Sequence, residues 1–198
     1  VTATATSRAS NGSYKMEVTE LATSAINVSQ NTLTAEGMEK INPLQTISSQ
    51  ADRFRGDVSV GAGTKIEFTT MHNGEVVNES IEVTADDTLD SILTKITNRD
   101  NGVRAFYDTT QDKIIMEKEV AGDHYSVDGN DSEIQFTNDS FMAQLFDMRD
   151  SEVKDIDGNV VYAGETGGTD ATFKYNGVEL TSKTNQTTLN GITFTFNN

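Results

Sequence analysis

The chain has 198 residues, a formal net charge of −16 and no cysteine. The negative charge would repel phosphate backbones and anionic lipid surfaces, so we expect neither a nucleic-acid partner nor a membrane partner. The lack of cysteine excludes disulfides, thiolate nucleophiles and cysteine-based zinc sites.

The N-terminal part of the chain is rich in threonine and has the patterns of β-structure. Apolar and polar residues alternate over residues 14–20, which is the period of a half-buried strand, and residues 26–28 continue a β pattern. Pro43 is the only proline and follows Asn42, so either a short helix capped by Asn42 or an irregular segment is expected there.

The middle of the chain contains the clearest supersecondary unit. Asn73-Gly74, a strong hairpin signal, separates two alternating segments. Apolar residues then recur at the i, i+3, i+4 and i+7 spacing of one helical face, and Asp86 or Asp87 is expected to cap this helix. The face consists of Leu89, Ile92, Leu93 and Ile96. Two further strands, at residues 102–108 and 113–119, complete a β-β-α-β-β unit.

A second helix is expected after a short strand at residues 134–137, with Asn138 or Asp139 as its cap. Its apolar face consists of Phe141, Met142, Leu145 and Phe146. The C-terminal part of the chain then returns to β patterns. A hairpin at Asn176-Gly177 is expected to pair with the strand at residues 14–20.

These patterns favour a mainly β fold with a few short helices, arranged as two domains of which one is inserted into the other. The two ends of the chain share a Thr-rich, strand-forming composition, so residues 1–56 and 163–198 are expected to form one discontinuous β domain. Residues 57–162 are expected to form the inserted domain, which is β-rich and contains the two short helices. Glycine clusters at residues 56–63 and 164–168 mark the expected crossings.

The chain offers little for catalysis. Its two histidines are His72, which borders the Asn73-Gly74 turn and is expected to be an exposed turn residue, and His124, which lies in a polar loop. Neither can be assigned a nucleophile and an orienting acid from sequence. No G-x-S-x-G motif is present, and no pair of carboxylates stands out from the acidic background. We therefore predict a protein that is not an enzyme and has no catalytic residue.

Two acidic segments, residues 128–133 and 155–159, resemble calcium loops. In both, the glycine comes too early for the EF-hand pattern, so ordinary turn chemistry is the favoured interpretation and calcium binding is left open. Residues 61–65 are glycine-rich but lack the spacing of a P-loop and precede a strand. Asn-x-Ser/Thr triplets at Asn11 and Asn185 are expected by chance in so Asn- and Thr-rich a chain. No cofactor site and no metal site is predicted.

The ends of the sequence show no targeting segment. No run of 18 apolar residues exists, so no membrane-spanning helix is expected. The first residues, VTATATSRAS, lack both an initiator methionine and the apolar core of a signal peptide. We interpret the sequence as a fragment or a processed product.

Three segments of the chain carry sequence motifs. The first consists of Ala3, Ala5, Gly12, Tyr14, Val18, Leu21 and Ala22. The second is the capped helix and strand pair, DTLDSILTKITN…GVRAFYDTTQDKIIM. The third consists of Ala171, Phe173, Asn176, Gly177 and Val178, followed by Asn185, Gly191, Ile192 and Thr193. In this order the segments resemble the bacterial flagellar filament capping protein family, hook-associated protein 2. The chain departs from the family at Thr97-Asn98, where Ile-Asn is usual, and at Lys183-Thr184, where Arg and Ser are common.

The resemblance implies a structural role. Such caps sit at the tip of the flagellar filament, promote flagellin polymerisation and prevent the loss of flagellin monomers. The helical ends through which the family forms its ring are missing from this sequence, so it resembles the outer domains, with flagellin as the implied partner. The implied localisation is extracellular, after export without a cleaved signal peptide. The alternative is a tip-exposed, adhesin-like module that binds host glycans or proteins, with the loop at residues 122–132 as its candidate site. No interface residue is assigned.

Overall fold

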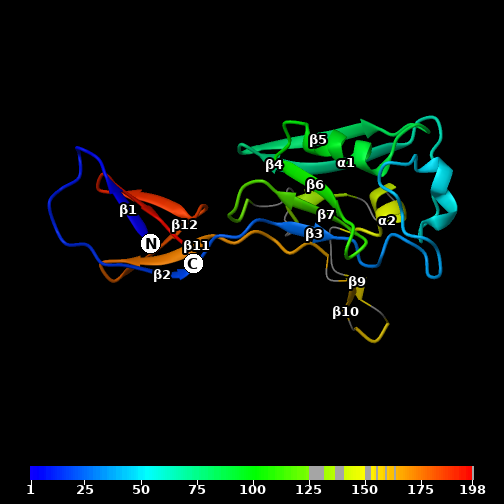
Figure 1. Cartoon of the computed structure of the whole chain (residues 1–198). Helices are drawn as coiled ribbons and strands as arrows, with labels where there is room; N and C mark the ends of the chain where they lie inside the picture. The colour runs from blue at the N-terminus through cyan, green and yellow to red at the C-terminus, as the bar shows by residue number, and fades with distance from the viewer. Residues whose placement is uncertain are drawn as a thin grey trace. The chain divides into compact units, whose positions relative to one another are not determined.

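The computed structural model describes residues 1–124, 132–136, 141–149, 153–154, 156–158, 160–162 and 164–197. The chain divides into two compact units. Unit 1 consists of Val1–Ala25, Val120–His124 and Gly167–Asn198, and unit 2 consists of Ile26–Glu119 and Tyr125–Thr166. Strands make up most of the regular structure in the described residues (Figure 1). The expected fold, mainly β with a few short helices and with one domain inserted into the other, is confirmed.

The first boundary between the units differs from the one we expected. It lies between Ala25 and Ile26, not near residue 56, because the intervening segment belongs to the core of unit 2. The core residues from this segment are Leu33, Ile41, Ile47 and Phe54. Gly56 is small for a packing reason, since a Cβ atom there would lie 1.9 Å from the Gln144 carbonyl oxygen. The return to unit 1, at Thr166–Gly167, falls within the glycine cluster at residues 164–168.

Unit 1 has two antiparallel three-stranded sheets among its described residues. One has the order β1 (Thr2–Ala5), β14 (Ile192–Thr195) and β13 (Gln186–Leu189). The other has the order β12 (Val178–Ser182), β11 (Ala171–Tyr175) and β2 (Met16–Glu20). The C-terminal hairpin therefore pairs with the N-terminal strand, as predicted. Its turn residues, Asn176 and Gly177, have φ angles of 50° and 86°, as a tight two-residue hairpin requires.

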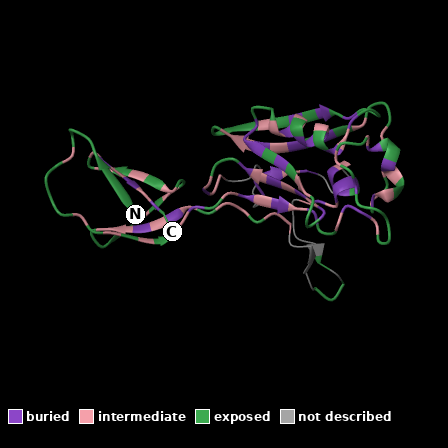
Figure 2. Cartoon of the chain, in the orientation of Figure 1, coloured by how far each residue is buried: buried purple, intermediate pink, exposed green. Residues whose placement is uncertain are grey.

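The core of unit 1 is small and rich in phenylalanine. Phe173 is 1% exposed, and its ring centroid lies 4.9 Å from that of Phe196. The residues buried with them are Ala22, Ala171, Ile192 and Phe194. Exposed and half-buried residues predominate along the rest of this unit (Figure 2).

Unit 2 contains two three-stranded sheets and a short strand pair among its described residues. The first sheet has the order β3 (Ile26–Val28), β7 (Lys113–Lys118) and β6 (Val103–Asp108). The second has the order β5 (Glu75–Glu82), β4 (Lys65–His72) and β8 (Ile134–Gln135). The strand pair is β9 (Val153–Lys154) with β10 (Val160–Tyr162). Both predicted hairpins of this region, β4–β5 and β6–β7, are present.

The helix α1 (Leu89–Thr97) buries the predicted apolar face, but its cap differs from the prediction. Thr88, not Asp86 or Asp87, is the N-cap: its Oγ1 accepts the Ser91 N–H at 3.0 Å, and the Ser91 Oγ accepts the Thr88 N–H at 3.0 Å. This reciprocal pair satisfies two of the free N–H groups at the helix start. α1 packs against β6 (Figure 1).

The two other helical segments are short. Near Pro43 the chain forms a turn, in which the Asn42 Oδ1 accepts the Leu44 N–H at 3.0 Å, and a 3-10 helix, η1, follows at Ser48–Arg53. The helix α2 (Phe141–Phe146) lies where the second helix was predicted. Its predicted caps, Asn138 and Asp139, lie outside the described residues.

Candidate functional site

The two histidines do not lie in a catalytic arrangement among the described residues. His72 is half-buried, which corrects our expectation of an exposed turn residue: its side chain is 18% exposed, and its Nε2 lies 3.0 Å from the Asp100 Oδ1. The ring packs on the loop after α1, where a Cβ atom at Gly102 would lie 2.3 Å from the His72 Nδ1. The His124 Nε2 lies 2.9 Å from the Ala121 carbonyl oxygen.

The sequence segments that resembled ligand loops add no site within the described residues. Asp128–Asp131, Asp155 and Asn159 lie outside the described residues, so calcium binding at these two acidic segments stays open. The described part of the chain holds no cluster of three metal-ligating side chains and no helix long and apolar enough to cross a membrane. At residues 61–65 the chain makes a turn, closed by the Thr64 N–H donating to the Gly61 carbonyl at 3.1 Å, before β4 begins.

Two asparagines of the C-terminal motif are structural. The Asn176 Oδ1 accepts the Lys15 N–H at 2.8 Å, just before β2. The Asn185 side chain bonds both main-chain groups of Ala22, just after β2, at 2.7 Å to the N–H and 3.0 Å to the carbonyl. The two side chains thus hold both ends of β2 to the C-terminal part of the chain. Asn185 begins one of the Asn-x-Ser/Thr triplets, and its side-chain amide is used in the two hydrogen bonds to Ala22.

A cleft of about 670 Å³ lies beside α1 and β6 in unit 2. Its apolar lining includes Leu93 and Ala105, which are buried, and Phe106, which is 39% exposed. α1 and its C-cap contribute polar side chains at a spacing of four residues, namely Asp90 and Thr94 from the helix and Asn98 from the cap. A cavity of this size with an apolar lining and a few polar groups is typical of ligand pockets. Sequence reasoning missed this cleft, although an apolar residue at an outward position of the predicted strand, Phe106, was a signal of it.

Tyr107 is fixed at the edge of the cleft by its hydroxyl group. The hydroxyl donates to the Asp112 Oδ1 at 2.6 Å, and the other oxygen of Asp112 accepts the Thr34 N–H at 3.1 Å. Burial and the hydrogen bond to Asp112 raise the pKa of Tyr107 well above its ordinary value. Tyr107 therefore stays neutral at physiological pH, and the main chain around it is held in place.

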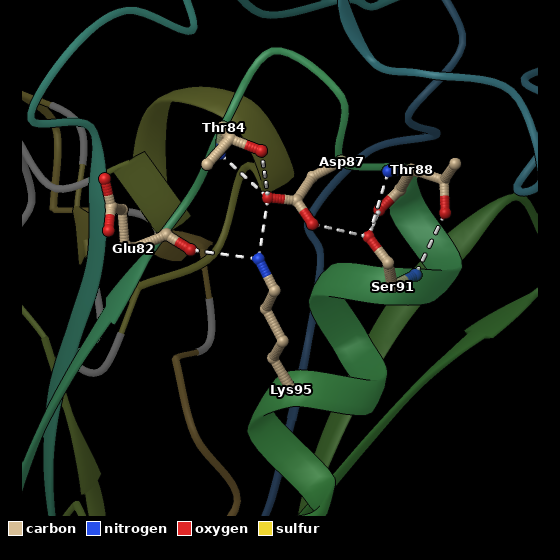
Figure 3. Close-up of polar contacts among 6 residues, drawn as sticks. All are labelled: Glu82, Thr84, Asp87, Thr88, Ser91 and Lys95. Carbon is tan, nitrogen blue, oxygen red and sulfur yellow. Dashed lines mark hydrogen bonds and ion pairs between the residues drawn. The ribbon is translucent and has the colours of Figure 1, made fainter.

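The start of α1, which carries the polar wall of the cleft, is fixed by Asp87 (Figure 3). The Asp87 Oδ2 accepts hydrogen bonds from the Lys95 Nζ at 2.7 Å and from the Thr84 N–H at 2.8 Å, and the Oδ1 accepts the Ser91 hydroxyl at 2.8 Å. Burial of Asp87 opposes its ionisation, but the hydrogen bonds from Lys95, Thr84 and Ser91 outweigh burial and lower its pKa from 3.8 to about 2. The ionised carboxylate thus joins the end of the β5 segment to the first two turns of α1.

We expect Asp87→Asn to lower the free energy of unfolding of unit 2 by about 2 kcal/mol at pH 7, since one pKa unit corresponds to about 1.4 kcal/mol. Because the folded pKa is lowered, this stability is present above about pH 4 and is lost as the pH falls toward about 2. Urea unfolding of both proteins over this pH range should show their difference shrinking. The matched control is Asp86→Asn, at an exposed neighbour. A difference that is independent of pH between 2 and 5 would contradict the prediction.

Comparisons with known proteins give one match in sequence. No protein-family model matches the chain. The chain is 29% identical over 196 residues to the flagellar hook-associated protein 2 of Halalkalibacterium halodurans. The match covers 93% of this chain and 34% of that protein, so the chain spans about a third of the length of this curated relative.

Solved structures show the same fold. The D2-D3 domains of the flagellar cap protein FliD from Serratia marcescens give a TM-score of 0.67 at 19% identity, covering 99% of this chain and 91% of that one. The same domains from Escherichia coli give 0.63 at 17% identity, covering 100% and 88%. FliD (HAP2) from Pseudomonas aeruginosa PAO1 gives 0.54 at 18% identity, covering 98% and 77%. The resemblance found in the sequence motifs is confirmed, and the chain has the fold of flagellar cap D2-D3 domains.

Proposed function

We propose that this chain forms the outer domains of a cap at the tip of a flagellar filament, where it promotes flagellin polymerisation and prevents the loss of flagellin monomers. The observation that carries the proposal is the similarity to flagellar cap proteins over nearly the whole chain, in sequence and in fold. The role is structural and not enzymatic, and its partners are flagellin and neighbouring cap subunits. The ring itself would be held by helical segments outside these 198 residues.

The architecture suits a protein that acts through its surfaces. Both units are β scaffolds with their own cores, and the motif residues Asn176 and Asn185 of unit 1 hold β2 in place. A cap must hold its position while it releases flagellin, so its individual contacts should be small and polar, as in transient interfaces. The net charge of −16 favours partners that are neutral or basic at the contact. The protein would work outside the cell, at the tip of the filament.

A chimera tests the proposal. This chain replaces the matching third of the Halalkalibacterium halodurans hook-associated protein 2, in cells of that organism that lack their own copy. We expect the amount of flagellin monomer in the culture medium to fall to near the wild-type amount, and swimming to return. The control is the same protein with the matching region deleted, which should not restore either. A chimera that is exported and stable, yet leaves the flagellin loss unchanged, would refute the proposal.

The adhesin-like alternative stays a prediction. Of its candidate loop at residues 122–132, only Gly122–His124 and Ser132 are described. Binding to a glycan array that survives raised salt concentration and maps to this loop would favour the alternative over the cap.

A further inference from the structure

β6 is an edge strand whose main chain is open at one residue. The sheet order β3-β7-β6 leaves β6 with a single neighbour, β7. Across this pair, Tyr107 lies opposite Ile114, and both main-chain groups of Ile114 turn toward Ser29: the Ser29 N–H donates to the Ile114 carbonyl at 3.0 Å, and the Ile114 N–H donates to the Ser29 Oγ at 3.1 Å. In an antiparallel pair, residues opposite such a position direct their own groups outward. The N–H and carbonyl of Tyr107 therefore point away from the sheet.

The other outward N–H groups of β6 already have hydrogen-bond partners. The Val103 N–H donates to the Asn101 Oδ1 at 2.9 Å. At Ala105, the Thr97 hydroxyl of α1 accepts the N–H at 2.9 Å and donates to the carbonyl at 3.2 Å. α1 thus closes the edge of β6 at Ala105, and Tyr107 is the outward residue whose N–H and carbonyl both lack a partner in the described part of the chain. An open donor and acceptor on a strand edge are a template for a further strand.

The open position lines the cleft beside α1, and the cleft has the chemistry to hold a peptide. Apolar atoms of Leu93, Pro43 and Phe106 surround the site, and the exposed Leu44 follows Pro43 in sequence. The polar wall of α1 faces the same cleft, and no ion pair or side-chain hydrogen bond engages Asp90 among the described residues. Among the described residues of the lining, the cation is Arg104, which is already paired with Glu117. The cleft therefore offers two main-chain hydrogen bonds, an apolar lining and one carboxylate, Asp90, that has no ion pair among the described residues.

We propose that this cleft binds an extended peptide segment of a partner protein, which adds to the edge of β6 and exchanges two main-chain hydrogen bonds with Tyr107. In strand addition of this kind, main-chain hydrogen bonds provide the affinity, and pockets for the side chains of the peptide provide the selectivity. The segment places an apolar side chain against Leu93 and Phe106 and a basic residue near Asp90. The inference rests on the proposed function in taking the partner to be a protein.

Amide hydrogen exchange measured by NMR tests the proposal on the chain itself. The probe is the peptide acetyl-Lys-Thr-Val-Thr-Val-Lys-amide, and the control probe is the same peptide with an N-methylated central valine, which lacks one main-chain donor. Without peptide, the Tyr107 amide should exchange much faster than the Phe106 amide, which bonds to β7. With the probe at about nine times its Kd, exchange at Tyr107 should slow by about tenfold, and the control probe should protect it far less.

A substitution in the cleft provides a second test of peptide binding. Thr94→Arg places a large cation on the exposed wall of α1, where arginine is a good helix former, and should weaken binding of the probe by at least about tenfold. The matched control is Val76→Arg, on the exposed edge strand β5, which should bind as the unchanged chain does. Absence of any protection at Tyr107, equal binding by Thr94→Arg, or protection by neutral disaccharides in place of the peptide would each overturn the proposal.

The hydrogen-exchange experiment and the chimera experiment test the peptide site and the cap function independently. Protection of Tyr107 by the probe together with a chimera that does not retain flagellin leaves the peptide site standing and removes the cap function. A chimera that retains flagellin together with an unprotected Tyr107 removes only the peptide site.

Discussion

Phe173→Ala is expected to unfold unit 1 and leave unit 2 folded. Phe173 is central in its sheet, on β11 between β12 and β2, and its ring packs on that of Phe196. Truncating a buried phenylalanine costs about 3–5 kcal/mol. A unit of roughly 60 residues buries a smaller fraction of its surface than a large domain does and has only about 3–9 kcal/mol of stability in total. The substitution therefore removes most of the stability of unit 1, whereas unit 2 keeps its own core.

Amide NMR spectra can follow the two units separately. In Phe173→Ala, we expect the dispersed signals of β11 and β14 to collapse and those of β4 and β7 to stay. The matched control is Val178→Ala on β12 of the same sheet, where the side chain is 61% exposed and the loss should be below about 0.5 kcal/mol. The expectation fails if Phe173→Ala keeps the unit 1 signals with a loss as small as that of Val178→Ala.

The same contacts explain why the sequence motifs were informative about the fold. Phe173 fills the core of unit 1, Asn176 holds the start of β2, and Asn185 holds its end. The hydrogen bonds of the two asparagines span 161 residues (Asn176 to Lys15) and 163 residues (Asn185 to Ala22) of sequence. The motif residues of unit 1 therefore indicate how its N-terminal and C-terminal segments are held together. They carry no information about which surface a partner contacts, which is why no interface residue could be predicted from them.

Local signals in the sequence predicted the elements that depend on local geometry. Asn73-Gly74 and Asn176-Gly177 both form tight hairpins because asparagine and glycine adopt the positive φ angles that such turns need. The apolar spacing of α1 predicted its buried face, because a helix repeats every 3.6 residues. The cap was assigned to the wrong residue because Asp87 and Thr88 are both good caps, and only the reciprocal bond with Ser91 distinguishes them.

Elements that depend on distant partners could not be predicted. β1 has the sequence Thr-Ala-Thr-Ala and is exposed throughout, so no large apolar residue marks it as a half-buried strand, and it exists because β14 pairs with it from the other end of the chain. The segment after Ala25 has no clear period, yet the Leu33 N–H donates to the Asp112 carbonyl at 2.9 Å and attaches the segment to unit 2. The cleft beside α1 likewise requires the sheet order, which leaves Tyr107 at an edge.

Lys118 is the least predictable member of the core, because its sequence position looks like the charged end of an ordinary strand. Its side chain is 2% exposed, and its Nζ donates to the Thr70 Oγ1 at 2.8 Å and to the Met71 carbonyl. Lys118 lies on β7 and both acceptors lie on β4, so the ammonium group joins the two sheets of unit 2. Burial lowers the pKa of Lys118, and the nearby carboxylates of Glu133 and Glu165 act against that shift.

We expect Lys118→Ala to lower the free energy of unfolding of unit 2 by about 3–5 kcal/mol, because it removes the cation beside a buried carboxylate and leaves the acceptors of β4 without their donor. Lys118→Met keeps most of the stem volume and should cost less than Lys118→Ala. Urea unfolding measures both. The matched control is Lys113→Ala on the opposite face of β7, where the lysine is half-buried and the loss should be below about 1 kcal/mol.

The three variants separate the two physical contributions of Lys118. If Lys118→Met and Lys118→Ala lose the same free energy, the stabilisation comes from the ammonium contacts between the sheets. If methionine restores most of the loss, it comes from packing of the stem between β7 and β4. A loss in Lys118→Ala no larger than that in Lys113→Ala would contradict both, and would mean that β4 and β7 are held together by their apolar side chains alone, of which Ile66, Ile114 and Met116 are fully buried.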